Sequence, residues 1–322
     1  MKKLFKEQKF IVLIVAIVLY VIFALLSKEF RRYTTIIQML DFAYYVVLMA
    51  IGVTFPLITG GVDLSIGTGM ICYALVGGFM IRNYHWPVVL AMLLSVLFGL
   101  VIGILNGTLV SVMGLPPFLA TLCTCMITRG LGTLLVNKQA VPWPTNKVPE
   151  GWFHSIFKLT IGRATKIPTG LIPIAIIVII MMFVLNHTRV GRYTIAIGSN
   201  REATRLSGVN VRIYHIAAYA ICGLFAGLAS IAYAAATPTV QPGTGAGLEL
   251  DAIGAAIVGG VSAAGGVGSI EGTVIGVLFI QILKIGLPFI GLEANWQQII
   301  LGLILIGAVL VDVIKKRKEA AL

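Results

Sequence analysis

Long apolar runs separated by short polar segments follow one another along the whole chain. A membrane-spanning helix needs about 20 consecutive apolar residues, and runs of roughly 17 or more recur from one end of this sequence to the other. The pattern predicts an all-α polytopic membrane protein with about ten transmembrane helices. The expected spans lie at about 10–26, 43–59, 64–81, 88–112, 117–136, 170–186, 213–236, 248–262, 270–290 and 296–314. The run at 248–262 is short and rich in glycine, so nine or eleven spans are open alternatives.

The composition leads to the same class of protein. Of the 322 residues, 58% are hydrophobic and 11% are charged, and the mean hydropathy is +1.00. Soluble domains carry about 25% charged residues, so this chain has too little polar surface to dissolve in water. The apolar run after the first nine residues is too long for a secretory signal core and lacks a small-x-small cleavage site, so we interpret it as an uncleaved first span. We expect residues 1–322 to form a single transmembrane domain.

The formal net charge of +12 comes from basic residues that lie between and beside the apolar runs. This placement is typical of topology control by Lys and Arg rather than of a nucleic-acid surface. A cytoplasmic N-terminus places most of them inside: Lys2, Lys3, Lys6, Lys9, Arg189, Arg192, Arg201, Arg205, Arg212, Lys315, Lys316, Arg317 and Lys318. Both termini are therefore expected in the cytoplasm, with a long outer loop at about 137–168 and a cytoplasmic loop at about 187–212. Lys28, Arg31 and Arg32 in the first outer loop run against the rule.

Two segments five spans apart resemble each other. Gly-Leu-Val-Ile-Gly-Ile-Leu at 99–105 is followed by Gly-Leu-Pro at 114–116, and Gly-Thr-Val-Ile-Gly-Val-Leu at 272–278 is followed by Gly-Leu-Pro at 286–288. An odd number of spans reverses orientation across the membrane, so the pattern indicates an inverted repeat, which is typical of transporters with a central site. Chance agreement within a Gly, Val, Ile and Leu alphabet is the alternative.

A polar break separates the second and third expected spans at Thr-Gly-Gly-Val-Asp-Leu-Ser, residues 59–65. Two glycines free the backbone, and Asp63 with Ser65 can satisfy exposed amides at the start of the next helix. A capped turn near the inner surface and a discontinuous helix at a solute pathway are both open interpretations.

Other polar side chains fall within or near the spans. Asn106, Arg129 and Gln281 are candidates for a pathway, because an intramembrane polar or ionisable group is costly and usually faces the protein interior. Arg129 and Lys284 can equally snorkel to an interface or lock helices together. Glu249 and Asp251 enter the short eighth run, where the positive end of a helix favours them.

The sequence contains no arrangement that indicates catalysis in this chain. The glycine-rich stretch at 263–272 lacks the Lys-Ser/Thr ending of an ATP-binding loop and follows no expected strand. The four His are scattered singly, no metal-ligand cluster is apparent, and Cys72, Cys123, Cys125 and Cys222 have no zinc-like spacing. We therefore expect no enzyme, no metal site and no cofactor in this polypeptide.

The outer loop contains an aromatic cluster. Trp152, Phe153, Ile156 and Phe157 can share one helical face that lies at the membrane interface. Docking of an external partner is the alternative interpretation.

One short polar segment, GSNREATRLSGV at 198–209, interrupts the apolar sequence on the cytoplasmic side. Ser199 followed by Glu202 predicts a capping box, Gly208 can end the helix, and Ala203 with Leu206 forms a small apolar ridge. A helix of about two turns is not stable alone. Lipid headgroups, the protein's own loops or a socket on a separate cytoplasmic subunit are the candidates to hold it.

Several motifs in this order resemble the permease subunit of bacterial sugar ABC importers, the family of ribose, xylose, galactose, allose and galactofuranose permeases. They are ITGGVDLSIG (58–67), GILNGTLV (103–110), GLPPFLATL (114–122), AIGSNREATRLSGVNV (196–211), LELDAIGAAIVGG (248–260) and AAGGVGSIEGT (263–273). The resemblance covers nearly the whole chain. It identifies no sugar-contacting residue. The candidates for the pathway or the helix break therefore rest on polarity alone, which suits a hydroxyl-rich solute. They are Asp63, Ser65, Asn106, Arg129 and Gln281.

The resemblance implies a machine of several subunits. Two permease copies, or one copy and a sister permease, join cytoplasmic ATPase subunits that bind ATP and Mg²⁺, and an extracytoplasmic binding protein delivers a monosaccharide. It implies a bacterial inner-membrane location and import powered by ATP on the partner. Ser199, Glu202, Ala203, Leu206 and Gly208 fall on the family's cytoplasmic coupling helix, where Thr204 stands at a position at which a small residue is common.

Other functions remain as alternatives. The same architecture can carry nucleosides, branched-chain amino acids or an autoinducer sugar. An ATP-independent secondary carrier or channel, or a membrane scaffold that moves no solute, belongs to another class; the acids of this chain cluster at span edges, which disfavours proton coupling.

Overall fold

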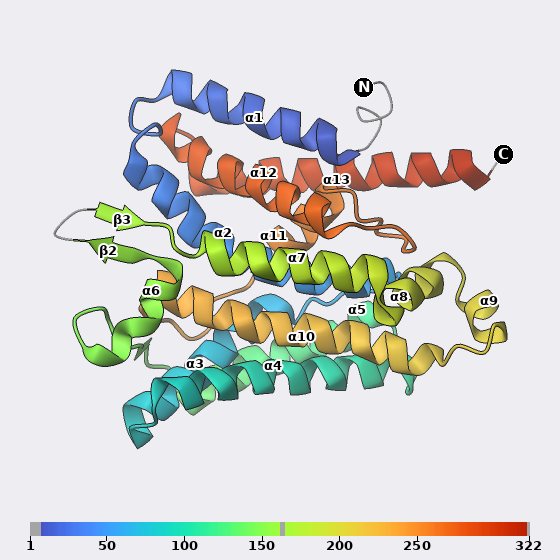
Figure 1. Cartoon of the computed structure of the whole chain (residues 1–322), viewed down its shortest axis with the longest axis horizontal. Coiled ribbons are helices and arrows are strands. Elements are labelled where there is room, and N and C mark those ends of the chain that lie inside the picture. The colour runs from blue at the N-terminus through green and yellow to red at the C-terminus, as the bar shows by residue number, and fades with distance from the viewer. Residues whose placement is uncertain (1–7, 162–164, 321–322) are drawn as a thin grey trace.

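The computed structural model describes residues 8–161 and 165–320, and the side chains of residues 8–161, 166–293 and 295–314. Lys2, Lys3 and Lys6 of the topology prediction lie outside the described residues, as do residues 162–164 of the outer loop. Thirteen α-helices account for most of the described chain (Figure 1). They are α1 (Gln8–Leu26), α2 (Tyr33–Ile58), α3 (Ile66–Tyr84), α4 (Val88–Ser111), α5 (Pro117–Leu135), α6 (His154–Phe157), α7 (Leu171–His187), α8 (Arg189–Ser199), α9 (Arg201–Leu206), α10 (Val211–Ala236), α11 (Leu248–Val258), α12 (Ile270–Phe289) and α13 (Ala294–Ala320).

Fewer helices than expected are long and apolar enough to cross a membrane. Seven helices in the described chain qualify, and α7 with α8, bent by 61°, can count as an eighth. The helix at the expected span 248–262 is α11, with 11 residues; at 1.5 Å per residue it is about 16 Å long, against about 30 Å of hydrocarbon. The polytopic helical class is confirmed, whereas a full eighth span at 248–262 is wrong, because glycines end this helix early.

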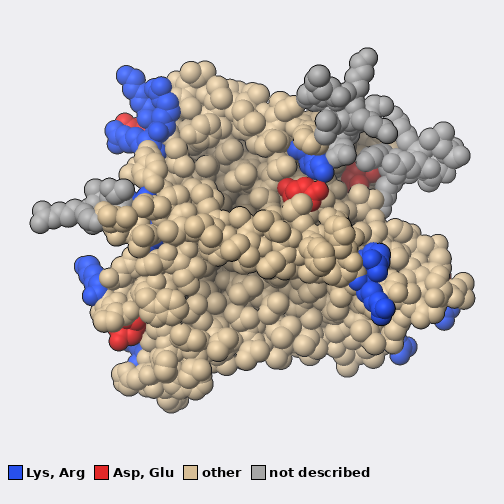
Figure 2. Space-filling model, in the orientation of Figure 1, with Lys and Arg blue, Asp and Glu red and all other residues tan. Residues whose placement is uncertain are grey.

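The molecule has two opposite ends, which carry different elements (Figure 1). The start of α1, the end of α13 and helix α9 lie at one end, which we call the inner end (Figure 1). The opposite, outer end carries α6 and the hairpin of β2 (Leu159–Ile161) and β3 (Thr165–Ile167). On the face seen in Figure 2, Lys and Arg gather toward these two ends and leave a broad uncharged band between them. The described chain ends therefore share a side with α9, which is the arrangement that the charge pattern predicts.

Helix α2 forms the centre of the bundle. Every residue from Ala43 to Ile58 is buried, so the predicted span 43–59 corresponds to its buried part, while the helix itself begins ten residues earlier, at Tyr33. Helix α10 packs along both α2 and α4. A Cβ added at Gly99 would meet the backbone of Gly223 and Gly227, so glycines let α4 and α10 approach closely.

The two halves of the chain make equivalent helix contacts, with equivalent helices five expected spans apart. Helix α3 packs on α4 and α5, and α11 packs on α12 and α13; α4 lies along α10, and α12 lies along α2. This is the pairing expected of an inverted repeat. The glycine contacts differ between the halves. Gly99 of α4 approaches α10, whereas Gly272 and Gly276 of α12 approach Ala255 of α11 and Gly259, the residue after α11.

The outer loop packs onto the bundle through short elements. Strand β1 (Val141–Pro142) pairs antiparallel with β4 (Thr239–Val240), and a 3-10 turn spans Pro149–Phe153. Phe153 is fully buried with its ring 5.5 Å from that of Trp143, whereas Trp152 is 48% exposed. The prediction of one shared aromatic face at the membrane interface is therefore wrong, because the 3-10 turn sends neighbouring side chains in different directions.

Candidate coupling helix and buried polar sites

Helix α9 is a six-residue helix at the inner end, joined to α8 by Asn200. The Asn200 side-chain oxygen accepts a hydrogen bond from the amide of Ala203 at 2.9 Å. Ser199 is the last residue of α8, and its hydroxyl donates to the carbonyl of Ile195 at 3.0 Å. The predicted capping box of Ser199 and Glu202 is thus wrong. Because α8 continues through Ser199, the first extended residue available as a cap is Asn200.

The C-terminal end of α9 lies where the sequence predicts it. Gly208 has φ +81°, and its amide donates to the carbonyl of Arg205 at 3.0 Å, so its predicted role in ending the helix is confirmed. The Glu202 carboxylate pairs with the Arg205 guanidinium at 2.9 Å on the exposed side. The helix is therefore bounded at both ends by local chemistry.

Helix α9 presents an apolar surface to solvent. Leu206 is 81% exposed, the largest fraction among the large hydrophobic side chains described. Ser199 and Ala203 line a neighbouring hollow of about 340 Å³. This polar part of the molecule thus combines one highly exposed leucine with a hollow on the neighbouring face.

Helix α8 anchors this surface to the bundle. A Cβ at Gly198 would collide with the carbonyl of Ile58, the last residue of α2, and with the amide of Gly266. The Gly266 amide donates to the Ile58 carbonyl at 2.8 Å, so the loop before α12 and the end of α2 are also joined. Helix α8, which leads through Asn200 into α9, is therefore packed closely against the end of the central helix α2.

A second polar site lies at the break between α2 and α3. The amide and the hydroxyl of Ser65 donate to one oxygen of Asp63 at 2.9 and 2.6 Å. The Asn106 amide on α4 donates to the Ser65 hydroxyl at 2.9 Å and approaches both Asp63 oxygens at 3.4 Å. The three side chains are 0 to 2% exposed. Asp63 therefore accepts from an amide at the turn, as the sequence predicts, whereas the predicted cap by Ser65 is wrong, because its hydroxyl donates to Asp63 instead of accepting from a helix amide.

No cation balances this cluster within the described chain. None of the ion pairs among the described residues includes Asp63. The side-chain oxygen of Asn106 and the hydroxyl of the neighbouring Tyr219 are buried and have no hydrogen-bond partner among the described residues. The site is therefore a network of hydrogen bonds around one buried carboxyl group.

The two remaining pathway candidates lie elsewhere. Arg129 is exposed on α5, and Gln281 is 3% exposed on α12. No hydrogen bond between described residues joins either of them to the cluster of Asp63, Ser65 and Asn106. The structure brings three of the predicted residues together and separates these two from them.

Threonines of α5 belong to the same polar region and were not predicted. The Thr121 hydroxyl lies 3.3 Å from the carbonyl of Val62 in the break, and the hydroxyls of Thr68 on α3 and Thr128 are 3.1 Å apart. Their spacing, with Thr124 between them, puts Thr121 and Thr128 on one helical face, which was the available signal.

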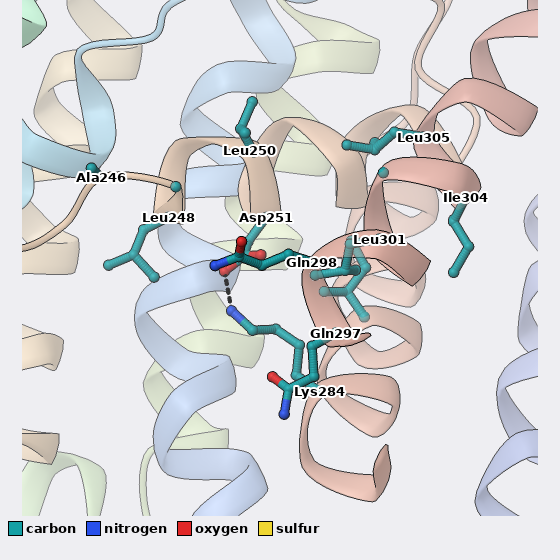
Figure 3. Close-up of a pocket in the computed structure, with 13 residues that line it drawn as sticks. Ala246, Leu248, Leu250, Asp251, Lys284, Gln297, Gln298, Leu301, Ile304 and Leu305 are labelled. Carbon is teal, nitrogen blue, oxygen red and sulfur yellow. Dashed lines mark hydrogen bonds and ion pairs between the residues drawn. The ribbon is translucent and has the colours of Figure 1, made fainter. Parts of the chain in front are cut away.

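An ion pair between α11 and α12 was also not predicted. The Lys284 ammonium lies 2.5 Å from the Asp251 carboxylate, with side chains 29% and 7% exposed. The pair lines a cavity of about 410 Å³, and Gln297 and Gln298 of α13 extend toward it (Figure 3). Leu248, Leu250, Leu301, Ile304 and Leu305 supply apolar walls.

This cavity offers donors and acceptors without net charge. The ion pair and the two amides form a polar end, and the leucines form an apolar remainder, a combination typical of sites for small neutral solutes. The sequence showed one acid and one base in apolar runs, and intramembrane charges usually pair. No group of His, Cys, Asp and Glu within the described residues could hold a metal ion.

Comparison with known proteins places these features in a family. The family model described as "Branched-chain amino acid transport system / permease component" matches residues 35–309. The ribose import permease protein of Escherichia coli (strain K12) is 36% identical over 313 residues, covering 95% of this chain and 93% of its own. The fructose import permease protein of Bifidobacterium longum is 31% identical, with 95% and 92% covered. The galactose/methyl galactoside import permease protein of Haemophilus influenzae is 31% identical, with 99% and 100% covered. No solved structure matches the chain.

Proposed function

The chain belongs to the permease-component family of the branched-chain amino acid transport system, and on this basis we propose that it is the membrane subunit of an ATP-driven importer for a monosaccharide. The observation that carries the proposal is the similarity, over nearly the full length, to import permeases named for ribose, fructose and galactose. The substrate is then a pentose or hexose. The whole chain acts as one transmembrane domain in the bacterial cytoplasmic membrane, with both termini and the loop at about 187–212 in the cytoplasm.

Helix α9 is the contact for a separate ATPase. The exposed Leu206 and the hollow lined by Ser199 and Ala203 supply a small apolar surface. Glu202 lies on the exposed side of the helix, and Gly208 ends it. The ATPase holds ATP and Mg²⁺, so this chain needs no cofactor of its own. A movement of α9 reaches α2 through the close contact of Gly198 with Ile58.

Asp63, Ser65 and Asn106 act at the helix break rather than as a free binding site, because their hydrogen bonds are directed at one another. The cavity with Asp251 and Lys284 is the better candidate for solute contact, since its polar groups line open space. Arg129 faces outward from α5 and suits the contact with a second permease copy or a sister permease. Gln281 is buried on α12 and supports the bundle near the pathway. The outer loop at about 137–168 faces the extracytoplasmic binding protein.

Reconstitution tests the proposal. The chain, its ATPase and its binding protein are placed in liposomes, and uptake of labelled ribose, fructose and galactose is measured with and without ATP. We expect saturable uptake of one of these sugars that requires ATP and both partners. Equal uptake without ATP contradicts the proposal.

The same preparation separates the alternatives. Uptake of a nucleoside, a branched-chain amino acid or an autoinducer sugar, with no monosaccharide uptake, would assign another cargo to the same machine. Uptake by the purified chain alone, driven by an ion gradient, would identify a secondary carrier. Complex formation without any flux would identify a scaffold.

A further inference from the structure

A cavity of about 290 Å³ opens at the inner end, next to α9. Its walls come from the loop 59–61 after α2, the end of α4 with the turn 114–117, Arg201 of α9 and His215 of α10. It is separate from the cavity between α11, α12 and α13. Four segments distant in the sequence thus surround one space beside the proposed ATPase contact.

His215 points to a missing partner in this cavity. Its side chain is 4% exposed, and neither ring nitrogen has a hydrogen-bond partner among the described residues. Buried polar groups almost always have a partner, so an unpaired one indicates a ligand or water that completes the site. His215 lines the cavity, and the Tyr219 ring lies 5.6 Å from its imidazole on the same helix.

The charges of the residues around the cavity indicate the chemical class of the ligand. Among the described residues that line it, Arg201 carries the only full charge, and no acidic side chain is present. Arg201 takes part in none of the ion pairs of the described chain, whereas Arg205 on the same helix is paired with Glu202. Arg201 also lies close enough to His215 to act on it electrostatically. An unpaired guanidinium beside an unpaired imidazole is the donor set for an oxyanion, and guanidinium binds phosphate oxygens in a bidentate manner.

We propose that this inner cavity binds a phosphate group, with Arg201 and His215 as its two side-chain ligands. The phosphate group can belong to inorganic phosphate, to a phosphorylated sugar or to a lipid headgroup. The bound group joins α9 to α10 and to the inner loops. Binding does not depend on which solute is transported.

The test is a titration of the purified full-length chain with inorganic phosphate. The detergent contains no phosphate group, and chloride keeps the ionic strength constant. A change on adding phosphate then reports phosphate binding rather than a general effect of salt. We expect a saturable rise of the melting temperature with phosphate, and an at least tenfold weaker affinity in Arg201→Gln, about the loss of one charge-assisted hydrogen bond. His215→Phe weakens binding in the same way.

Arg205→Gln is the matched control, because it removes the same charge from the same helix, whereas Arg205 does not line the cavity. It should bind phosphate with wild-type affinity. The proposal is overturned if phosphate has no saturable effect on the wild-type chain, if Arg201→Gln binds normally, or if both arginine variants lose affinity equally. Arg201 is exposed, so its variant keeps the test decisive even if His215→Phe does not fold.

A second titration identifies the source of the phosphate. Nanodiscs of phosphatidylglycerol are compared with the micelles, and glucose 6-phosphate is compared with inorganic phosphate. Loss of free-phosphate binding in the nanodiscs assigns the site to a lipid headgroup, and persistence assigns it to a soluble phosphate.

Discussion

Asp63 and Asp251 are two buried aspartates that the same bundle accommodates in different ways. Asp63 is 1% exposed and lies in the glycine-containing break before α3, and Asp251 is 6% exposed and lies in the first turn of α11, after Gly247. Asp63 is held by a serine and an asparagine, with no cation in the described chain. Asp251 is held by the ammonium of Lys284.

The difference separates a structural site from an accessible one. The hydrogen bonds of Asp63 join the break before α3 to α4, and little space is left around them. The pair of Asp251 and Lys284 borders a cavity, and Lys284 is still 29% exposed. A buried carboxylate needs hydrogen-bond donors or a cation in either case. Only the pair of Asp251 and Lys284 leaves its polar groups open to a solute.

Removal of Lys284 should have the largest effect on stability. Lys284→Met leaves the Asp251 carboxylate buried without its cation, and breaking a buried pair in this way costs about 3–5 kcal/mol. We expect a marked fall in the thermal melting temperature in detergent. The double variant Asp251→Leu with Lys284→Met removes both charges and should recover most of the loss. A single variant as stable as the wild type would show that the pair is not effectively buried.

Removal of the Asp63 carboxyl group should have an intermediate effect. Asp63→Ala leaves the Ser65 amide and hydroxyl without their acceptor, at a cost of about 1–3 kcal/mol. Asp63→Asn keeps an acceptor oxygen for the Ser65 amide and hydroxyl, so it should lose less than about 1 kcal/mol. Equal losses in both variants would mean that Asp63 acts through its charge, as Asp251 does. The measurement is the free energy of unfolding in mixed micelles.

Removal of the Tyr219 hydroxyl should have the smallest effect. This hydroxyl is buried next to Gly61 and has no partner among the described residues. Tyr219→Phe should therefore change the melting temperature little, since no hydrogen bond is lost. A loss above about 1 kcal/mol would reveal a bound water that extends the Asp63 network.

Local patterns in the sequence predicted the parts of the fold that depend on local chemistry. The apolar runs located the helices, and Gly208 located the end of α9, because a positive φ at a helix end favours glycine. The cap was misplaced by one residue, since Ser199 and Asn200 are both good caps and the length of α8 decides between them. Helix α11 was predicted too long because an apolar composition does not report where glycines turn the chain.

The parts that depend on long-range packing were not predictable in the same way. Asp63 and Asn106 are 43 positions apart, and Asp251 and Lys284 are 33 apart. Each residue was recognisable as a polar group in an apolar run, but its partner follows from how whole helices cross. The exposed Arg129 shows the same limit, since polarity alone cannot tell a side chain that faces inward from one that faces outward.

The coupling role of α9 is the central claim, and the ratio of ATP hydrolysed to sugar transported tests it most directly. Both are measured in the same proteoliposomes for the wild type, Leu206→Asp and Glu202→Lys. Leu206 is 81% exposed, so its replacement should leave membrane insertion and stability unchanged. An aspartate buried in the ATPase contact costs more than about 1.4 kcal/mol, so uptake should fall at least about tenfold while ATP hydrolysis continues. Wild-type uptake and an unchanged ratio in both variants would contradict the assignment of α9.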